Sequence, residues 1–225
     1  MKIKAAGIVT RTMKYKDTSI ITDIFTDGYG LQSYIINNIR SSRSKISIGL
    51  FQPLTLLTIV AYHKDDSSLK RLSEAHCPYP FQTIHTNIRK TAIAIFLAEF
   101  LSRICRTTDP YPDLFLYIKT QLQKLDELDS RFEDFHLRFM MQLSRYLGFQ
   151  PANSTELAAQ IGISLSPEER SKFDGILNNK EIETLTYKER KYLLEAILDF
   201  YTLHIDGFSK MSSISILHEV LKNEK

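Results

Sequence analysis

Apolar and polar residues alternate along the first eighty positions with the two-residue period that is typical of β-strands. Turn residues divide this part of the chain into five such segments: 5–15, 18–26, 31–37, 54–63 and 69–77. Asp27-Gly28 follows the second segment, and this dipeptide is a strong signal for a β-hairpin. Five short strands without a helix between them predict a small closed barrel of the OB-fold type, since closure removes unpaired sheet edges.

Amphipathic helical patterns replace this alternation after residue 81. Apolar positions now recur at three- and four-residue steps, which is the period of a helix with one buried face. They predict helices over residues 87–106, 113–128, 131–149, 190–206 and 213–221. Capping boxes at 166–169 and 186–189 mark helix starts in and after a more polar stretch. We therefore expect an α+β multidomain protein, with a five-stranded OB-fold β-barrel at 1–80 and an all-α helical bundle domain at 81–225.

Composition places the chain among ordinary globular proteins, with 225 residues, 43% of them hydrophobic and 24% charged. The apolar runs are too short to cross a membrane, and no signal pattern opens the chain. We therefore expect a soluble cytoplasmic protein. Cys77 and Cys105 belong to no Cys-x-x-Cys pair, so we expect free thiols that are buried or half-buried.

The net charge of +3 hides an asymmetry along the chain. Residues 1–64 contain nine Lys or Arg and three Asp, so their net charge is 9 − 3 = +6. The remaining residues therefore sum to 3 − 6 = −3. A basic N-terminal part indicates a polyanionic partner, which composition alone does not identify further.

The segment 37–49 contains three cations and four serines without an acid. Guanidinium, ammonium and hydroxyl groups all donate hydrogen bonds to phosphate oxygens, although a solvated loop is the alternative for this segment alone. More cations end the first strand, and loops of a small barrel converge on one rim. We expect one phosphate-binding surface made of six cations: Arg11, Lys14, Lys16, Arg40, Arg43 and Lys45.

Tyrosines near these cations are candidates for stacking on nucleic-acid bases. Tyr15 and Tyr34 are the preferred pair, with Tyr29 between them in the sequence. Each stacked ring is worth about 1–3 kcal/mol. For any one of these tyrosines, packing in the core or against a neighbouring strand is the alternative.

Catalytic motifs are missing from the sequence. The six histidines show no HExxH or HxH spacing, and no nucleophile elbow, P-loop or dinucleotide-binding glycine pattern occurs. His136 lies beside acids on a predicted helix, and a solvated helix face explains it best. We therefore expect a binding protein rather than an enzyme, although a site assembled from distant residues leaves no spacing signature.

The order of these features resembles the RecO family of bacterial recombination mediators and DNA-repair proteins. Tyr15 ends the first strand and Asp17 follows it; Phe25-Thr26 ends the second strand, and Gly30 lies in the turn after it. The basic loop comes next, and Gln52-Pro53 precedes the fourth strand. Near the C-terminus a Tyr-x-x-His element also fits the family. The resemblance covers essentially the whole chain.

The resemblance implies that the six cations bind single- and double-stranded DNA and that the protein anneals complementary strands. It implies RecR and single-stranded DNA-binding protein as partners, in a pathway that loads RecA at gaps and breaks. The acidic, apolar-ended tail of the single-stranded DNA-binding protein needs a groove flanked by cations. The helix at 87–106 offers Arg89, Lys90, Arg103 and Arg106, with ordinary solvated cations as the alternative.

A departure from the family concerns zinc. Many members carry a four-cysteine zinc site after the third helix, whereas this chain has no cysteine beyond Cys105. The polar segment 152–170 stands in its place. We therefore expect no zinc and no other cofactor.

Two further functional classes stay open. One is an OB-fold protein that binds RNA or a protein scaffold and does not anneal strands, and the other is a metal-dependent nuclease. An annealing assay with complementary oligonucleotides distinguishes the first from a recombination mediator. DNA degradation with added magnesium or manganese reveals the second.

Overall fold

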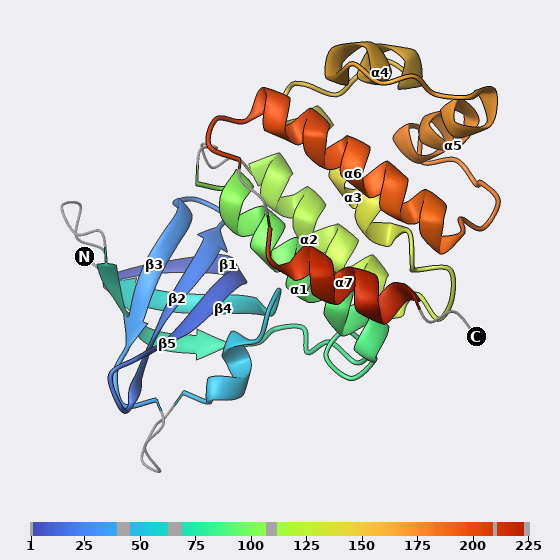
Figure 1. Cartoon of the computed structure of the whole chain (residues 1–225). Coiled ribbons are helices and arrows are strands. Elements are labelled where there is room, and N and C mark those ends of the chain that lie inside the picture. The colour runs from blue at the N-terminus through green and yellow to red at the C-terminus, as the bar shows by residue number, and fades with distance from the viewer. Residues whose placement is uncertain (1, 40–45, 63–68, 107–111, 209–210, 223–225) are drawn as a thin grey trace. The chain divides into compact units, whose positions relative to one another are not determined.

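The computed structural model describes residues 2–39, 46–62, 69–106, 112–208 and 211–222. Within these ranges the chain forms five strands followed by seven α-helices (Figure 1). It divides into two compact units, Met1–Asp126 and Glu127–Lys225, and each is described by itself below. The change from strands to helices lies between residues 76 and 88, whereas the division into compact units comes after Asp126.

The first unit begins with a closed barrel whose strands neighbour one another in the order β1-β2-β3-β5-β4. The strands are β1 (Lys2–Tyr15), β2 (Ser19–Thr26), β3 (Gly30–Ile36), β4 (Leu56–Tyr62) and β5 (Leu69–His76). β1 closes the barrel because its first half pairs with β4 and its second half pairs with β2. β3 and β5 pair in parallel, and all other pairs are antiparallel. The predicted OB-fold barrel with a following helical part is confirmed.

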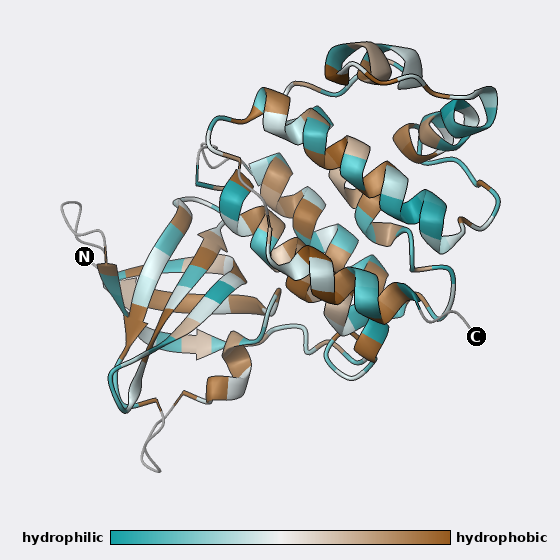
Figure 2. Ribbon diagram, viewed as in Figure 1, coloured by the Kyte–Doolittle hydropathy of each residue, from teal (hydrophilic) through white to brown (hydrophobic). Residues whose placement is uncertain are grey.

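Successive side chains of a strand point alternately to the inside and the outside of the barrel. Figure 2 shows residues of contrasting hydropathy following one another along the strands. The interior contains a core of buried apolar residues that includes Val9, Ile20, Ile24, Tyr34 and Ile59. The 3-10 helix η1 (Ile48–Phe51) adds the ring of Phe51 to this core. The barrel therefore has the packed interior that an independently stable sheet of this size requires.

Glycine is needed at two points of the barrel. A Cβ atom on Gly7 would lie 2.5 Å from Cγ2 of Ile24, so the missing side chain lets the neighbouring strands pack. Gly30 has a φ of +64° at the start of β3, in the left-handed region that glycine adopts readily. The predicted hairpin around Asp27-Gly28 is present, because β2 and β3 pair from Thr26–Gly30 onward.

Two helices complete the first unit: α1 (Ile88–Ile104) and α2 (Pro112–Glu127). Asn87 caps α1 with its side-chain oxygen, which accepts hydrogen bonds from the backbone N–H groups of Arg89 and Lys90. α1 packs against β1, and the ring of Phe115 on α2 lies 6.0 Å from that of Phe25 on β2. These helices therefore cover part of the outer surface of the barrel.

A buried carboxylate ties the segment before α1 to the end of α2. Asp126 accepts hydrogen bonds from the backbone N–H groups of Gln82, Thr83 and Ile84 at 3.0, 2.8 and 3.1 Å. Lys90, which is 2% exposed, donates from Nζ to Thr83 Oγ1 at 2.6 Å and to the Asp126 carbonyl at 2.9 Å. Burial acts to raise the pKa of Asp126, and the hydrogen bonds from Gln82, Thr83 and Ile84 outweigh it, so that the pKa is lowered.

The second unit is helical. Its elements are α3 (Phe135–Tyr146), α4 (Ser154–Ile161), α5 (Pro167–Leu177), α6 (Tyr187–His204) and α7 (Ser213–Lys222). The polar segment 152–170 contains α4, which sequence periodicity did not predict. Tyr201 Oη donates a hydrogen bond to the Met140 carbonyl at 2.7 Å, and His204 stacks on Phe149 with ring centroids 4.7 Å apart. The predicted Tyr-x-x-His element thus joins α6 to the chain around α3.

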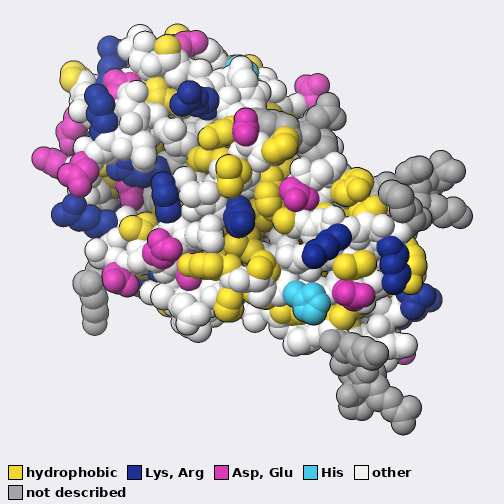
Figure 3. Space-filling view, turned by 180° about the vertical axis from the view of Figure 1, so that it is seen from behind, with side chains coloured by type: hydrophobic (Ala, Val, Ile, Leu, Met, Phe, Trp, Pro, Cys, Tyr) yellow, Lys and Arg dark blue, Asp and Glu magenta, His cyan; other side chains and the backbone are white. Residues whose placement is uncertain are grey.

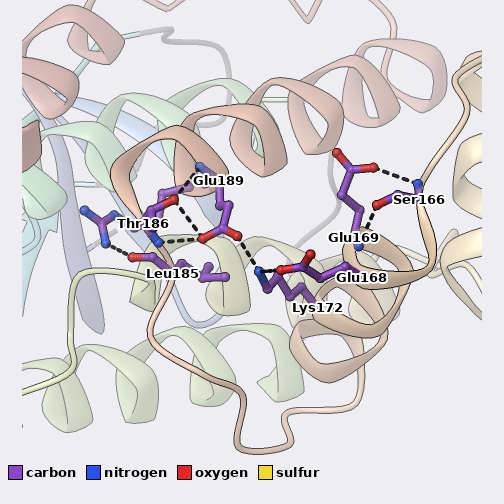
Figure 4. A network of polar contacts seen from close by, with 8 residues as sticks. Ser166, Glu168, Glu169, Lys172, Leu185, Thr186 and Glu189 are labelled. Atoms are coloured by element: carbon purple, nitrogen blue, oxygen red, sulfur yellow. Dashed lines mark hydrogen bonds and ion pairs between the residues drawn. The ribbon is translucent and has the colours of Figure 1, made fainter.

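Both predicted capping boxes are formed, and Lys172 of α5 contacts the second of them at Glu189 (Figure 4). Ser166 with Glu169 caps α5, and Thr186 with Glu189 caps α6. Lys172 Nζ donates to Glu168 Oε1 at 2.6 Å and forms a second ion pair with Glu189. The lysine hydrogen bond is the largest cause that lowers the pKa of Glu189 to about 2. This Lys172 clasp therefore holds α5 to the first turn of α6.

The prediction of a solvated His136 is wrong. The side chain lies on α3 with 1% of its surface exposed. Burial, followed by the nearby Arg190 and His218, lowers its pKa to about 3. The imidazole is therefore neutral near pH 7, because desolvation disfavours its charged form.

The two cysteines lie as expected, Cys77 half-buried and Cys105 buried, and both are free thiols. Burial raises the pKa of the Cys105 thiol, which keeps it protonated near pH 7. Over the described ranges, no helix combines the length and the apolar character that crossing a membrane requires.

Candidate nucleic-acid interface

The outer side of β2 shows how far the helices cover the barrel. Three of its residues face outward: Phe25, Asp23 and Ile21. Phe25 is nearest to the contact with α2, and Ile21 is farthest from it. Phe25 is buried at the contact with Phe115 of α2. Asp23 is 3.5 Å from the Arg106 guanidinium, which lies just after α1. Ile21 is half-buried, so the more exposed part of this surface begins there.

Strand register places a row of four side chains across this more exposed part. Met13 of β1 pairs with Ile21 of β2, Ile21 pairs with Ile35 of β3, and Ile35 pairs with Arg71 of β5. Paired residues point to the same side of a sheet, about 4.8 Å from one another across each strand pair. Met13 is 37% exposed, both isoleucines are half-buried and Arg71 is exposed. We call Met13, Ile21, Ile35 and Arg71 the outer row.

An aromatic ring and cations border the outer row. Tyr15 lies two positions beyond Met13 on the same side of β1 and is 37% exposed. The Lys16 ammonium lies 5.4 Å from the centre of the Tyr15 ring, in a residue with a φ of +52°. Arg11 lies two positions before Met13 and is exposed as well. The outer row is therefore flanked by a ring and by positive charge along β1.

The charge around Arg11 is partly compensated. Arg11 pairs with Asp23 in the β1–β2 ladder, and Asp23 also accepts a hydrogen bond from Ser33 Oγ at 2.5 Å. Arg106 approaches the other oxygen of Asp23, with 56% of its side chain exposed. Two cations therefore flank one carboxylate, which leaves a positive balance at this edge of the outer row.

Such an arrangement fits an unstacked nucleic acid. Apolar and aromatic side chains on a sheet offer flat surfaces to bases, and neighbouring cations contact the phosphates without reading sequence. OB-folds bind oligonucleotides on this kind of surface. The chemistry of the outer row and its border is thus that of a single-strand platform.

The structure places the predicted DNA-binding cations differently from one another. Arg11 and Lys16 lie on the side of Tyr15, next to the outer row. Lys14 pairs with the buried Ile20 and therefore points to the opposite side of β1. The other members of the predicted set, Arg40, Arg43 and Lys45, lie outside the described residues.

Tyr34 is not available for stacking. Its ring is 0% exposed in the barrel core, and burial is the largest cause that raises its pKa to about 12. A side chain enclosed on all sides cannot contact a base at the surface. The core alternative therefore describes Tyr34, which we remove from the predicted stacking pair.

The four cations predicted to flank a groove for the partner's tail also have different surroundings: Arg89, Lys90, Arg103 and Arg106. Lys90 is buried in the Asp126 network and does not flank any groove, so its assignment is corrected. Arg103 forms an ion pair with Glu99 at 2.8 Å, and Arg106 lies beside Asp23. Arg89 is half-buried in the first turn of α1.

Sequence reasoning missed the four residues of the outer row. The alternation of apolar and polar residues shows which residues of one strand point to the same side. It does not show that Met13, Ile21 and Ile35, on three different strands, lie next to one another. The cross-strand register that joins them to Arg71 depends on barrel closure, for which the sequence carries no direct signal. In the sequence, Ile21 and Ile35 are indistinguishable from other apolar residues of a strand.

Charged side chains of both signs are spread over the surface drawn in Figure 3. In the space-filling view of Figure 3, Lys and Arg side chains alternate with acidic and hydrophobic ones on the face that is drawn. Among the described residues, no group of three or more His, Cys, Asp or Glu is placed to hold a metal ion. The candidate interface is therefore defined by strand register and exposure.

Comparison with known proteins points to a single family. The family models described as "Recombination protein O N terminal" and "Recombination protein O C terminal" match residues 1–81 and 85–158. The DNA repair protein RecO of Flavobacterium johnsoniae is 35% identical over 236 residues, covering 98% of this chain and 99% of that protein. The proteins of the same name from Phocaeicola vulgatus and Bacteroides fragilis are 34% and 32% identical, each covering 96% of this chain and 98% of the relative. The chain therefore belongs to the RecO family.

Proposed function

We propose that this protein is a DNA-binding recombination mediator in RecF-pathway repair. The observation that carries the proposal is the outer row with Tyr15 and Arg11 at its border, on the open side of an OB-fold barrel. Membership of the RecO family supports a role in recombination repair. In this proposal the protein works in the bacterial cytoplasm, in association with the nucleoid.

The proposed mechanism is binding without bond making. The barrel holds single- or double-stranded DNA through its phosphates and orders a single strand through contacts with its bases. Cations between two backbones reduce the repulsion of their phosphates, which favours pairing of complementary strands. No step in this mechanism calls for a catalytic residue, so we propose that the protein is not an enzyme.

Protein partners belong to the same proposal. We propose that RecR and single-stranded DNA-binding protein act with this chain to load RecA onto covered DNA. Of the cations predicted for the tail of the latter protein, Arg89, Arg103 and Arg106 remain candidates at or near the surface of α1. Charge attraction to an acidic tail is expected to weaken with rising salt.

A strand-annealing assay tests the proposed function directly. Two complementary oligonucleotides, each labelled with one dye of an energy-transfer pair, are mixed with and without the protein. We expect faster annealing with protein, and a smaller acceleration as salt rises, because bound phosphates release counterions. RNA binding without acceleration of DNA annealing would favour the alternative OB-fold function instead. Shortened oligonucleotides after incubation with magnesium or manganese would indicate a nuclease.

Variants at the border of the outer row identify the surface. The double variant Arg11→Ala, Tyr15→Ala removes one cation and one ring, and stacking alone is worth about 1–3 kcal/mol. We expect at least tenfold weaker binding of a single strand, measured by fluorescence anisotropy. Lys124→Ala on α2 is the matched control, since Lys124 is exposed on a helix of the same unit. Equal losses in both variants would argue against this surface.

The basic loop provides a second test. We propose that Arg40, Arg43 and Lys45 contact phosphates, so replacing all three by Ala should weaken DNA binding. The thermal midpoint should stay nearly unchanged, because solvated loop cations contribute little to stability. A parallel loss of both quantities would show that the loop is structural.

A further inference from the structure

The outer row continues around the barrel beyond Arg71. Arg71 of β5 pairs not only with Ile35 of β3 but also, on its other side, with Tyr62 of β4. Tyr62 in turn pairs with Lys2 at the start of β1. Since the barrel is closed and β1 contributes both ends, one line of neighbours runs from Met13 to Lys2.

The added residues have the same chemistry as the border of the outer row. Tyr62 is 46% exposed, the largest exposure among the large hydrophobic side chains of the described barrel strands. The Lys2 ammonium lies 5.2 Å from the centre of the Tyr62 ring. This pair repeats the arrangement of Lys16 over Tyr15, where the distance is 5.4 Å. An exposed ring with an adjacent cation therefore stands at each end of the line.

We propose that Tyr62 and Lys2 form a second base-stacking subsite, which receives the continuation of a single strand bound at the outer row. This proposal rests on the proposed function. The line crosses all five strand pairs of the closed barrel, so it runs once around the barrel and measures about 24 Å along the curved surface, against about 10 Å for the part on β1, β2 and β3. Site sizes of about 4–16 nucleotides per OB-fold accommodate either length.

Charge favours a nucleic acid strand over other occupants of this surface. The line contains the cations Arg71 and Lys2 and no acid. Among the described residues, two acids lie one row away by register: Asp23, which pairs with Arg11 and approaches Arg106, and Glu74, which pairs with Val60 beside Lys4. Arg71 lies between Ile35, the last apolar residue of the outer row, and Tyr62. There it is placed to contact a phosphate that joins bases at the two subsites.

A length series with the full chain tests the continuation. Fluorescence anisotropy is measured with a short oligothymidylate of about 4 nucleotides and a long one of about 12. Tyr62→Ala should weaken binding of the long oligonucleotide about tenfold, the loss of one stacked base, and leave the short one unchanged. Tyr62→Phe keeps the ring and should bind like the unaltered protein, and Leu116→Ala provides an exposed apolar control on α2.

Each other outcome has a definite meaning. Unchanged binding of the long oligonucleotide by Tyr62→Ala would overturn the second subsite while leaving the proposed function intact. Two short oligonucleotides bound per chain would replace a continuous strand by two separate ones and overturn the continuation. If the unaltered protein binds neither oligonucleotide, the proposed function itself fails. An equal loss with both lengths would overturn the subsite, and thermal midpoints would then assign the loss to folding.

Discussion

At the scale of single residues, two buried ionisable groups on helices have folded-state pKa values below their ordinary ones, one as an ionised carboxylate and the other as a neutral imidazole. Asp126 is charged and accepts several hydrogen bonds, so its environment favours the ionised form. His136 is enclosed near Arg190 and His218, so its environment favours the neutral form. Both groups couple the stability of the protein to pH.

Replacing Asp126 should release the segment that leads into α1. Asp126→Ala leaves the backbone N–H groups of Gln82, Thr83 and Ile84 without this acceptor, so we expect a loss of about 3 kcal/mol in the free energy of unfolding. Urea titration at pH 7 measures it, with the exposed Asp129→Ala as control. A folded pKa below the usual value means that the stabilisation is present above that value and lost as pH falls. The two proteins should therefore converge in acid, and a constant difference would contradict this.

His136 predicts a loss of stability in acid that begins at a higher pH than that of Asp126. Its folded pKa of about 3 lies below the ordinary value of 6.5, so the unfolded chain binds a proton first as the solution is acidified. Stability should therefore fall from pH 6.5 downward, by roughly 1 kcal/mol per pH unit from this group. His136→Leu removes the titrating group and should flatten the dependence between pH 6.5 and 5 in urea titrations. An identical slope in both proteins would show that His136 is already charged when folded.

At the scale of elements, the sequence predicted what periodicity and capping encode. The strands, the hairpin at Asp27-Gly28 and both capping boxes are present, because each depends on neighbours within a few residues. Helix α4 escaped prediction because its eight residues are too few to show a clear period. Burial of His136 and Tyr34 depends on which side of an element meets the core, and a single polar position does not reveal it.

The candidate interface illustrates the same limit. Tyr15 and Arg11 were predicted from a local cluster of rings and cations. Arg71 is distant in sequence from both and joins them only through the register of β3 with β5. Long-range register emerges from closure of the whole barrel, so no local pattern contains it.

The Lys172 clasp yields a prediction at this scale. Lys172→Met removes the ion pairs with Glu168 and Glu189, so the second unit should unfold at a lower urea concentration at pH 7. The pKa of Glu189 is lowered to about 2, so the stabilisation is present above about 4.5 and lost as pH falls toward 2. The difference from the unaltered protein should therefore shrink in acid. Lys188→Met, an exposed lysine near the start of α6, is the control, and an equal effect there would contradict a specific clasp.

At the scale of the whole molecule, the central claim is that cations on the outer side of the barrel neutralise phosphates of a bound strand. For single strands, the logarithm of the binding constant falls with the logarithm of salt concentration by about 0.7 per neutralised phosphate. This slope counts contacts without depending on their individual strengths. It therefore distinguishes lost phosphate contacts from general weakening of the complex.

The most direct measurement is the salt dependence of single-strand binding by the double variant Arg11→Ala, Lys16→Ala. Anisotropy titrations over a series of salt concentrations give the slope for the variant and for the unaltered protein. If both cations contact phosphates, the slope should become shallower by about 1.4, which is two contacts at 0.7 each. An unchanged slope, with or without weaker binding, would contradict the claim that this side of the barrel binds the DNA backbone.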